Sequence, residues 1–163
     1  MTPTNTPWSM DDLARRKRMA GVAGGDADKE DWELTEAVLA AAMEVHTRLG
    51  PGLLESVYER CLRLELQLRG IPFAAQIALP VRYKGLELDE GYRLDLLIAG
   101  RLVVEIKSVD KLAAIHTAQV VTYLRLTGFP TALLINFNEV HLRQGIRRLS
   151  LRSRTAANAT AGT

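Results

Sequence analysis

Two apolar runs that meet at Ala99–Gly100 constrain the fold more than any other part of this sequence. YRLDLLI (Tyr92–Ile98) precedes the junction and RLVVEIK (Arg101–Lys107) follows it. Both have the composition of β-strands, and a glycine between them is typical of a tight turn, so the sequence predicts a hairpin. Charged residues nevertheless interrupt the apolar ones in both strands. A buried charge without a partner costs too much free energy to be kept, so these charges must find partners.

The length of the loop decides whether Asp95 and Glu105 can meet. Alternate side chains of a strand share a face. A two-residue loop at Ala99–Gly100 would set Asp95 opposite Val104 and leave Glu105 on the other face. A three-residue loop, Ile98–Gly100 with Gly100 at positive φ, would set Asp95 opposite Val103 and diagonal to Glu105. A site that uses both carboxylates therefore requires an odd loop or a bulge.

In that register, Asp95 and Glu105 can share one hard cation, because Mg²⁺ prefers oxygen ligands. Such an ion polarises a phosphoryl oxygen and lowers the pKa of a bound water. Lys107, on the same face as Glu105, can orient or help deprotonate that water, or balance the charge of a pentavalent intermediate. The alternative is a cross-strand salt-bridge cluster on an exposed face, where each pair contributes only ~0.2–1 kcal/mol.

The stretch GPGLLESVYE, residues 50–59, supplies a further carboxylate. Gly50-Pro51-Gly52 separates a helix expected over 34–49 from one expected over 53–69. Glu55 shares a helical stripe with Tyr58, Leu62 and Leu66, so we expect its carboxylate to point towards the body of the protein, where the metal site would be its partner. Alternatively, Glu55 bonds backbone N–H groups at the start of its helix, where its charge suits the helix dipole.

The remaining periodicity predicts an α/β (α+β sandwich-like) protein with a mixed central sheet flanked by helices. Strands are expected over 76–85, on both sides of Gly100 and over 131–137, and a third helix over 112–127. The order is α-α-β-β-β-α-β, and Pro80 indicates that the first strand lies near an edge. We expect a flexible arm over 1–30, the domain over 31–152 and a disordered tail over 153–163.

Composition narrows the function only slightly. The net charge of +2 argues neither for nor against nucleic acid, although basic runs at Arg15–Arg18 and Arg143–Arg154 can steer a polyanion. Cys61 is the only cysteine, so no internal disulfide forms. No apolar run approaches the ~18 residues of a membrane span, and no signal-peptide segment is visible. We therefore expect a cytoplasmic protein with no membrane partner.

The charged residues also match a known pattern. Asp95 with Glu105-Ile106-Lys107 resembles the D…E-x-K signature of the PD-(D/E)XK nuclease superfamily, although Leu94 replaces its proline. Gln119 and Tyr123 resemble the Q-x-x-x-Y element of the RecB-like members. More narrowly, Gly52, Glu55 and Tyr58, followed by YKG, DLL, VEIKSV and LLINF, resemble the GxxExxY proteins. The resemblance runs from about Thr35 to Leu149.

This resemblance implies a restriction-endonuclease-like core and a metal-dependent nuclease that hydrolyses DNA or RNA, with DNA favoured over RNA. Its catalytic residues would be Glu55, Asp95, Glu105 and Lys107, the three carboxylates binding Mg²⁺ or Mn²⁺. Gln119, Tyr123, Tyr58 and Lys84 would contact or support the substrate, although a plain polar helix edge would also explain Gln119 and Tyr123. A homodimer or higher homo-oligomer is plausible. The rival function is a non-catalytic nucleic-acid-binding or assembly module that retains the fold.

Overall fold

A single five-stranded sheet organises the chain, in the strand order β1-β2-β3-β4-β5. The computed structural model describes Arg15 and residues 26–151. The elements, in order, are α2 (Asp26–Leu49), α3 (Glu55–Leu68), β1 (Phe73–Tyr83), β2 (Leu86–Ile98), β3 (Leu102–Lys107), α4 (Ala114–Thr127), β4 (Thr131–Asn136), the short 3-10 helix η1 (Leu142–Gly145) and β5 (Ile146–Ser150). Within the described residues, no helix is both long enough and apolar enough to cross a membrane.

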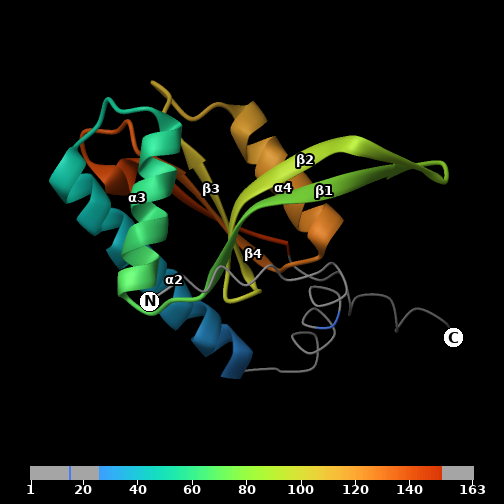
Figure 1. Cartoon of the computed structure of the whole chain (residues 1–163), viewed down its shortest axis with the longest axis horizontal. Coiled ribbons are helices and arrows are strands. Elements are labelled where there is room, and N and C mark those ends of the chain that lie inside the picture. Colours follow the sequence, from blue (N-terminus) through green and yellow to red (C-terminus); the bar gives the residue numbers. More distant parts are fainter. Residues whose placement is uncertain (1–14, 16–25, 152–163) are drawn as a thin grey trace, which may run out of the picture.

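Helices cover both faces of the sheet, as Figure 1 shows. Pairing is antiparallel from β1 to β3, parallel between β3 and β4, and antiparallel again between β4 and β5. The mixed sheet with flanking helices is therefore confirmed. The predicted order stopped at β4 and missed β5, because β5 lies inside the basic run Arg143–Arg154. Only Ile146 and Leu149 of β5 are half-buried, so its apolar pattern is short.

The sheet separates two apolar cores. One lies between the sheet and the helix pair α2–α3 and includes Val38, Tyr58, Leu62, Leu66, Leu96, Ile98, Val104 and Ile106. The other lies between the sheet and α4 and includes Leu94, Leu97, Val103, Val120, Tyr123, Leu124 and Leu134. The helical spacing of Tyr58, Leu62 and Leu66 explains why α3 packs with this stripe inward.

Side chains of a regular strand alternate between the two faces of the sheet, but along β2 this alternation is interrupted at Asp95. We call this interruption the phase change. Leu94 belongs to the core beneath α4, whereas Leu96 belongs to the core beneath α2 and α3, although residues two apart normally share a face. Gln76 of β1, between the pairs Ala75–Leu96 and Ile77–Leu94, has a positive φ of 54°. Pairing of β2 with β3 covers only Leu96–Ile98. The two strands therefore part at Asp95, and this opening becomes the candidate site.

The odd loop expected between β2 and β3 is confirmed, but it lies one residue later than predicted. Ala99, Gly100 and Arg101 connect the strands, with φ of +49° at Ala99 and +70° at Gly100. Ile98 stays in the strand because its side chain is fully buried and because Ala99 N–H donates to the carbonyl of Pro72 at 2.8 Å. The resulting register carries Asp95 towards Glu105 instead of towards Val103.

Hydrogen bonds fix the loop that leads into α3. The Tyr58 hydroxyl donates to the Gly50 carbonyl at 2.5 Å and accepts from Leu53 N–H at 3.1 Å. Ser108, directly after β3, donates its hydroxyl to the Leu53 carbonyl at 2.6 Å. Gly52 has a φ of +100°, which favours glycine. The start of α3 is thus tied both to its own second turn and to the end of β3.

The prediction that the strand containing Pro80 lies at an edge is confirmed, because β1 is an outer strand of the sheet. The β1–β2 register shifts between Leu79 and Val81, where Pro80 cannot donate a ladder hydrogen bond. Gly91 lies against this bulge: a Cβ there would lie 1.8 Å from the Leu79 carbonyl oxygen.

The first predicted helix, α2, begins at Asp26, upstream of the predicted position 34. Arg16–Arg18 and the predicted tail 153–163 lie outside the described residues.

Replacing Tyr58 by Phe should lower the free energy of unfolding by about 1 kcal/mol, because Leu53 N–H and the Gly50 carbonyl lose their shared partner. Urea denaturation would measure the change. Tyr83→Phe is the matched control, since Tyr83 is 62% exposed in the β1–β2 turn region. Equal stabilities of the two variants would contradict the structural role of the Tyr58 hydroxyl.

Candidate active site

Asp95 and Glu105 lie where β2 and β3 part. Asp95 Oδ2 accepts a hydrogen bond from the backbone N–H of Ile106 at 2.8 Å, beyond the last β2–β3 pair. Glu105 is 2% exposed, and its Oε1 accepts from Lys107 Nζ at 2.7 Å. Its other oxygen, Oε2, is buried and has no hydrogen-bond partner within the described structure. A buried carboxylate oxygen of this kind needs a donor or a cation.

The pKa shifts in the site also indicate that the charged form of Glu105 is poorly stabilised. Burial, the charge of Asp95 and a side-chain hydrogen bond that Glu105 in its protonated form shares with Asp95 raise the pKa of Glu105 to about 8, although Lys107 opposes the rise. Burial also raises the pKa of Asp95, and the charges of Glu59 and Glu55 add to the effect, while the Ile106 N–H and Lys107 oppose it. Lys107 therefore interacts with three carboxylates, those of Glu105, Glu55 and Asp95. In the absence of a cation, Glu105 retains a proton at neutral pH.

Lys107 is the cation of this group. Its side chain is 12% exposed and is bonded to Glu105. Burial works to lower the pKa of Lys107, but the hydrogen bond to Glu105 and the charges of Glu105, Glu55 and Asp95 outweigh it, so the pKa is raised. Lys107 is therefore protonated in this state. Of the roles expected from the sequence, donating hydrogen bonds and balancing charge fit better than removing a proton.

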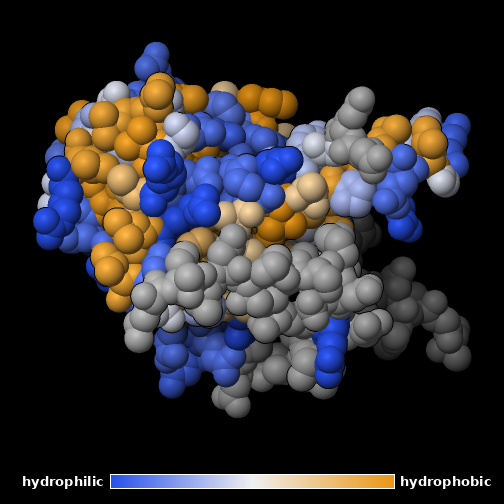
Figure 2. Space-filling view, viewed as in Figure 1, coloured by the Kyte–Doolittle hydropathy of each residue, from blue (hydrophilic) through white to orange (hydrophobic). Residues whose placement is uncertain are grey.

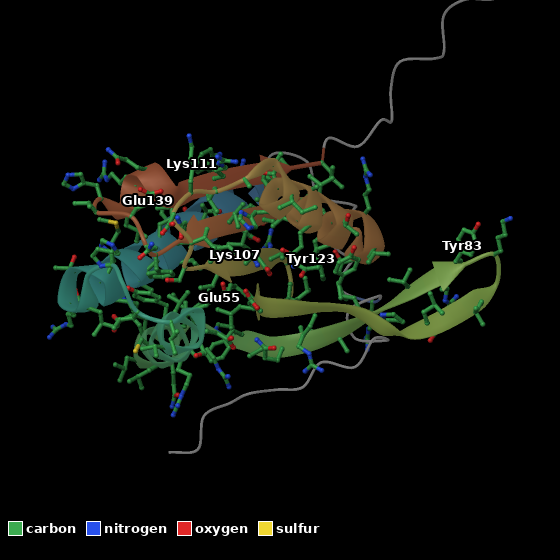
Figure 3. The ribbon with its side chains drawn as sticks, turned by 90° about the horizontal axis from the view of Figure 1, so that it is seen from above. Glu55, Tyr83, Lys107, Lys111, Tyr123 and Glu139 are labelled. Carbon is green, nitrogen blue, oxygen red and sulfur yellow. The ribbon has the colours of Figure 1, made fainter. Side chains whose placement is uncertain are left out.

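Glu55 lies at the rim of the site, and its side chain is not enclosed as the helical stripe suggested. It is exposed, because it is the first residue of α3 and precedes the buried stripe by one turn. Its charge nevertheless acts on Lys107 and Asp95, and Figure 3 shows it across from Lys107. Its position in the first helical turn also suits the helix dipole.

The structure brings two of the three predicted carboxylate ligands, Asp95 and Glu105, close together. In Arg15 and residues 26–151, no group of three or more His, Cys, Asp or Glu side chains is arranged to hold a metal ion. The structure thus brings together Asp95, Glu105 and Lys107 and leaves Glu55 at the edge.

Gln119 and Tyr123 of α4 support β2 next to Asp95. The buried Tyr123 hydroxyl accepts from Gln119 Nε2 at 2.6 Å and donates to the Arg93 carbonyl at 3.2 Å. Burial and the charge of Glu105 raise the pKa of Tyr123, so its hydroxyl keeps its proton. The two residues therefore do more than line a polar helix edge. They attach α4 to the strand two residues before the phase change.

Of the other two residues expected to contact or support the substrate, Tyr58 holds a loop of the site, whereas Lys84 lies away from the site. Tyr58 is buried and holds the loop before Glu55, as described above. Lys84 lies in the β1–β2 turn, 5.4 Å from the centroid of the Tyr83 ring. Figure 3 shows Tyr83 at the far tip of the hairpin, away from Lys107. The length of β1 and β2, 11 and 13 residues, carries this turn away, so the structure does not bring Lys84 to the site.

Glu59 is a site residue that the sequence reasoning missed. It accepts a hydrogen bond from Gln76 Nε2 at 2.8 Å, lies 3.6 Å from Arg63 Nη1, and its charge acts on Asp95. Its position four residues after Glu55 could have indicated this role, because that spacing places both carboxylates on one side of α3. Glu59 and Gln76 thus hold β1 opposite the phase change in β2.

The raised pKa of Glu105 predicts a pH-dependent stability. A carboxyl group with an ordinary pKa of 4.5 in the unfolded chain and about 8 in the folded one favours folding below pH 4.5, and this contribution is lost as the pH rises to 8. We expect the metal-free protein to lose stability over this range, by an amount of the order of a few kcal/mol. Thermal or urea unfolding in EDTA at several pH values would measure it.

Glu105→Gln should flatten this pH dependence, because the amide does not titrate. Glu36→Gln is the control, since Glu36 is exposed on α2. A Glu105→Gln profile as steep as that of the wild type would contradict the assignment.

Comparison with known proteins agrees with this geometry. The family model described as the PD-(D/E)XK nuclease superfamily matches residues 32–149, which include the whole sheet except its last residue. No curated protein and no solved structure gives a significant match. The matched region contains the parted strands, the Asp95–Glu105–Lys107 cluster and the supporting α4. The chain belongs to the PD-(D/E)XK nuclease superfamily.

Proposed function

We propose that this protein is a metal-dependent nuclease that hydrolyses phosphodiester bonds of DNA or RNA with Mg²⁺ or Mn²⁺. The observation that carries the proposal is the buried Oε2 of Glu105, which as an ionised carboxylate has no donor within the described structure and lies in the same cluster as the Asp95 carboxylate. Membership of the nuclease superfamily gives this cluster its chemical context.

The donor set fits a hard divalent cation. Mg²⁺ takes oxygen ligands, keeps several waters and is commonly held by only one or two carboxylates. Asp95 and Glu105 would hold the ion directly, and the exposed Glu55 would reach it through a water. When bound, the ion would polarise a phosphoryl oxygen and lower the pKa of a coordinated water. Its charge would also allow Glu105 to ionise at neutral pH.

The chain's own residues would bind and orient the other participants. Lys107, protonated and anchored on Glu105, would donate to the attacking water or to a phosphate oxygen. Asp95 would be kept in place by the Ile106 N–H. Tyr123 and Gln119 would hold β2 at Arg93, so that the Asp95 carboxylate does not move when the substrate binds.

The Gly52–Tyr58 segment supports assignment to the GxxExxY proteins within the superfamily. Each motif residue has a distinct role: Gly52 adopts a φ of +100°, Glu55 begins α3 beside Lys107, and Tyr58 fixes the loop between them.

Cleavage of a labelled panel of linear, nicked, branched and single-stranded DNA and of RNA, with Mg²⁺, Mn²⁺ or EDTA, tests the function. We expect metal-dependent cutting that Asp95→Ala and Lys107→Ala each reduce at least about 100-fold, because both remove groups at the reacting atoms. Lys29→Ala on α2 is the control, since Lys29 is exposed and paired with Glu33.

Three other outcomes would contradict the proposal in different ways. Cutting that survives in both variants would indicate a contaminating nuclease. No cutting, together with no Mg²⁺ or Mn²⁺ binding by calorimetry, would remove the catalytic function. No cutting while nucleic acid still binds to Asp95→Ala would identify the rival function, a non-catalytic binding or assembly module.

A further inference from the structure

Helix α3 carries a second apolar stripe, which is exposed except at its middle member, Cys61, a half-buried residue that packs against the core. The first stripe, Tyr58, Leu62 and Leu66, is fully buried. The second begins at the residue before the helix and consists of Leu54, Val57, Cys61, Leu64 and Leu68. Leu54 and Leu68 are each 73% exposed, Leu64 is 56% exposed and Val57 is 36% exposed. Figure 2 shows apolar side chains gathered over this part of the molecule.

The spacing of the outer stripe is that of a coiled-coil seam. Its members are separated by three, four, three and four residues, which are the a and d positions of two successive heptads. Single exposed leucines are common on protein surfaces, but a continuous line of them marks an interaction site. The partner that this spacing fits is another helix.

The charged residues on either side of the stripe indicate which helix would be the partner. Arg60 precedes an a position and Glu65 follows a d position, so they occupy g and e positions of the heptad. In a parallel helix pair, a g residue faces the e residue five positions later in its partner. Arg60 would then face Glu65 of the partner subunit, and the two-fold axis would form this pair twice. Arg60 is exposed and makes no ion pair with the described residues.

An antiparallel pair lacks this match. There, g positions face g positions, and the side of α3 that carries Arg60 also carries Ser56, Arg63 and Gln67 but no acid. Like charges would therefore meet across the axis. Glu65 already bonds Arg69 of its own helix at 2.7 Å, and its second oxygen can accept from a partner as well.

We propose that α3 packs in parallel against α3 of a second copy, forming a two-fold homodimer. The 14-residue helix is about 21 Å long, so the seam alone is smaller than the ~800 Å² per partner of a standard interface. The dimer is accordingly weak and depends on concentration. Leu53, which is 38% exposed and directly precedes the stripe, enlarges the apolar contact.

The parallel order has a structural consequence. Both α3 helices start at the same end of the dimer, so both copies of Glu55 and both candidate sites lie at that end. Two sites at one end can engage one nucleic-acid molecule, whereas an antiparallel dimer would separate them. The dimer itself rests on the outer stripe and its charges, independently of whether the site cleaves phosphodiesters.

Sedimentation analysis of the full chain over a range of concentrations tests the interface. We expect a reversible monomer–dimer equilibrium that Leu68→Glu shifts at least about tenfold towards monomer, because a charge enters the seam. Val140→Glu is the matched control, since Val140 is 74% exposed outside α3 and its replacement should leave the equilibrium unchanged. Arg60→Glu should weaken the dimer, and Arg60→Glu combined with Glu65→Arg should restore it.

Disulfide cross-linking tests the parallel order in a Cys61→Ala background. Leu54→Cys alone and Leu68→Cys alone should each give a covalent dimer on mild oxidation, because equal positions meet in a parallel pair. A mixture of the two variants that yields only the mixed cross-link would overturn the parallel order. Circular dichroism of each variant would show that the fold is retained.

Two further results would overturn the proposal. A wild-type chain that stays monomeric at every concentration would exclude the dimer. A dimer that Leu68→Glu leaves intact would place the contact elsewhere. In the monomeric case, protease sensitivity of residues 1–25 that increases on Leu68→Glu would identify the chain's own N-terminal segment as the occupant of the stripe.

Discussion

The parting of β2 from β3 is the feature on which the candidate site depends. Had the ladder continued past Leu96, Ile106 N–H would have bonded a strand carbonyl, and the polar groups between the strands would have paired with one another. Instead, Asp95 uses a side-chain oxygen to satisfy that N–H, and Glu105 becomes buried with one oxygen unsatisfied. An opening between two strands thereby becomes a small, carboxylate-lined site that binding of a cation would stabilise.

Three separate contacts keep this opening in place. Tyr123 of α4 holds β2 at the Arg93 carbonyl, while Gln76 of β1 is held by Glu59 of α3. Ser108, one residue past Lys107, is bonded to the loop that begins α3. Because these contacts come from both layers of helices, the carboxylates stay fixed even though the strand ladder itself is interrupted. Preorganisation of this kind is what an electrostatic site requires.

Much of the fold follows from local pattern. Apolar stripes at helical spacing and strand-like runs between glycines predicted α2, α3, α4 and four of the five described strands, because side-chain period and turn residues act over a few positions. The odd loop followed instead from the requirement that Asp95 and Glu105 lie on one face. The pattern failed where long-range pairing decides. β5 was hidden among arginines because its half-buried residues depend on pairing with β4. The phase change at Asp95 was equally invisible, since it occurs beside the positive φ of Gln76 on the neighbouring strand β1, which no local pattern indicates.

The sequence by itself determined the chemistry of this protein. It provides acidic and basic residues at strand positions where apolar ones would pack better, and such residues persist only if they are satisfied by partners or ligands. Only the tertiary structure decided how these residues meet. It buried Glu105 but left Glu55 exposed at the rim, it moved Lys84 to the tip of a hairpin, and it brought Glu59 close to Asp95. The physical reason is that burial and electrostatic coupling depend on distances between elements, and no local periodicity carries that information.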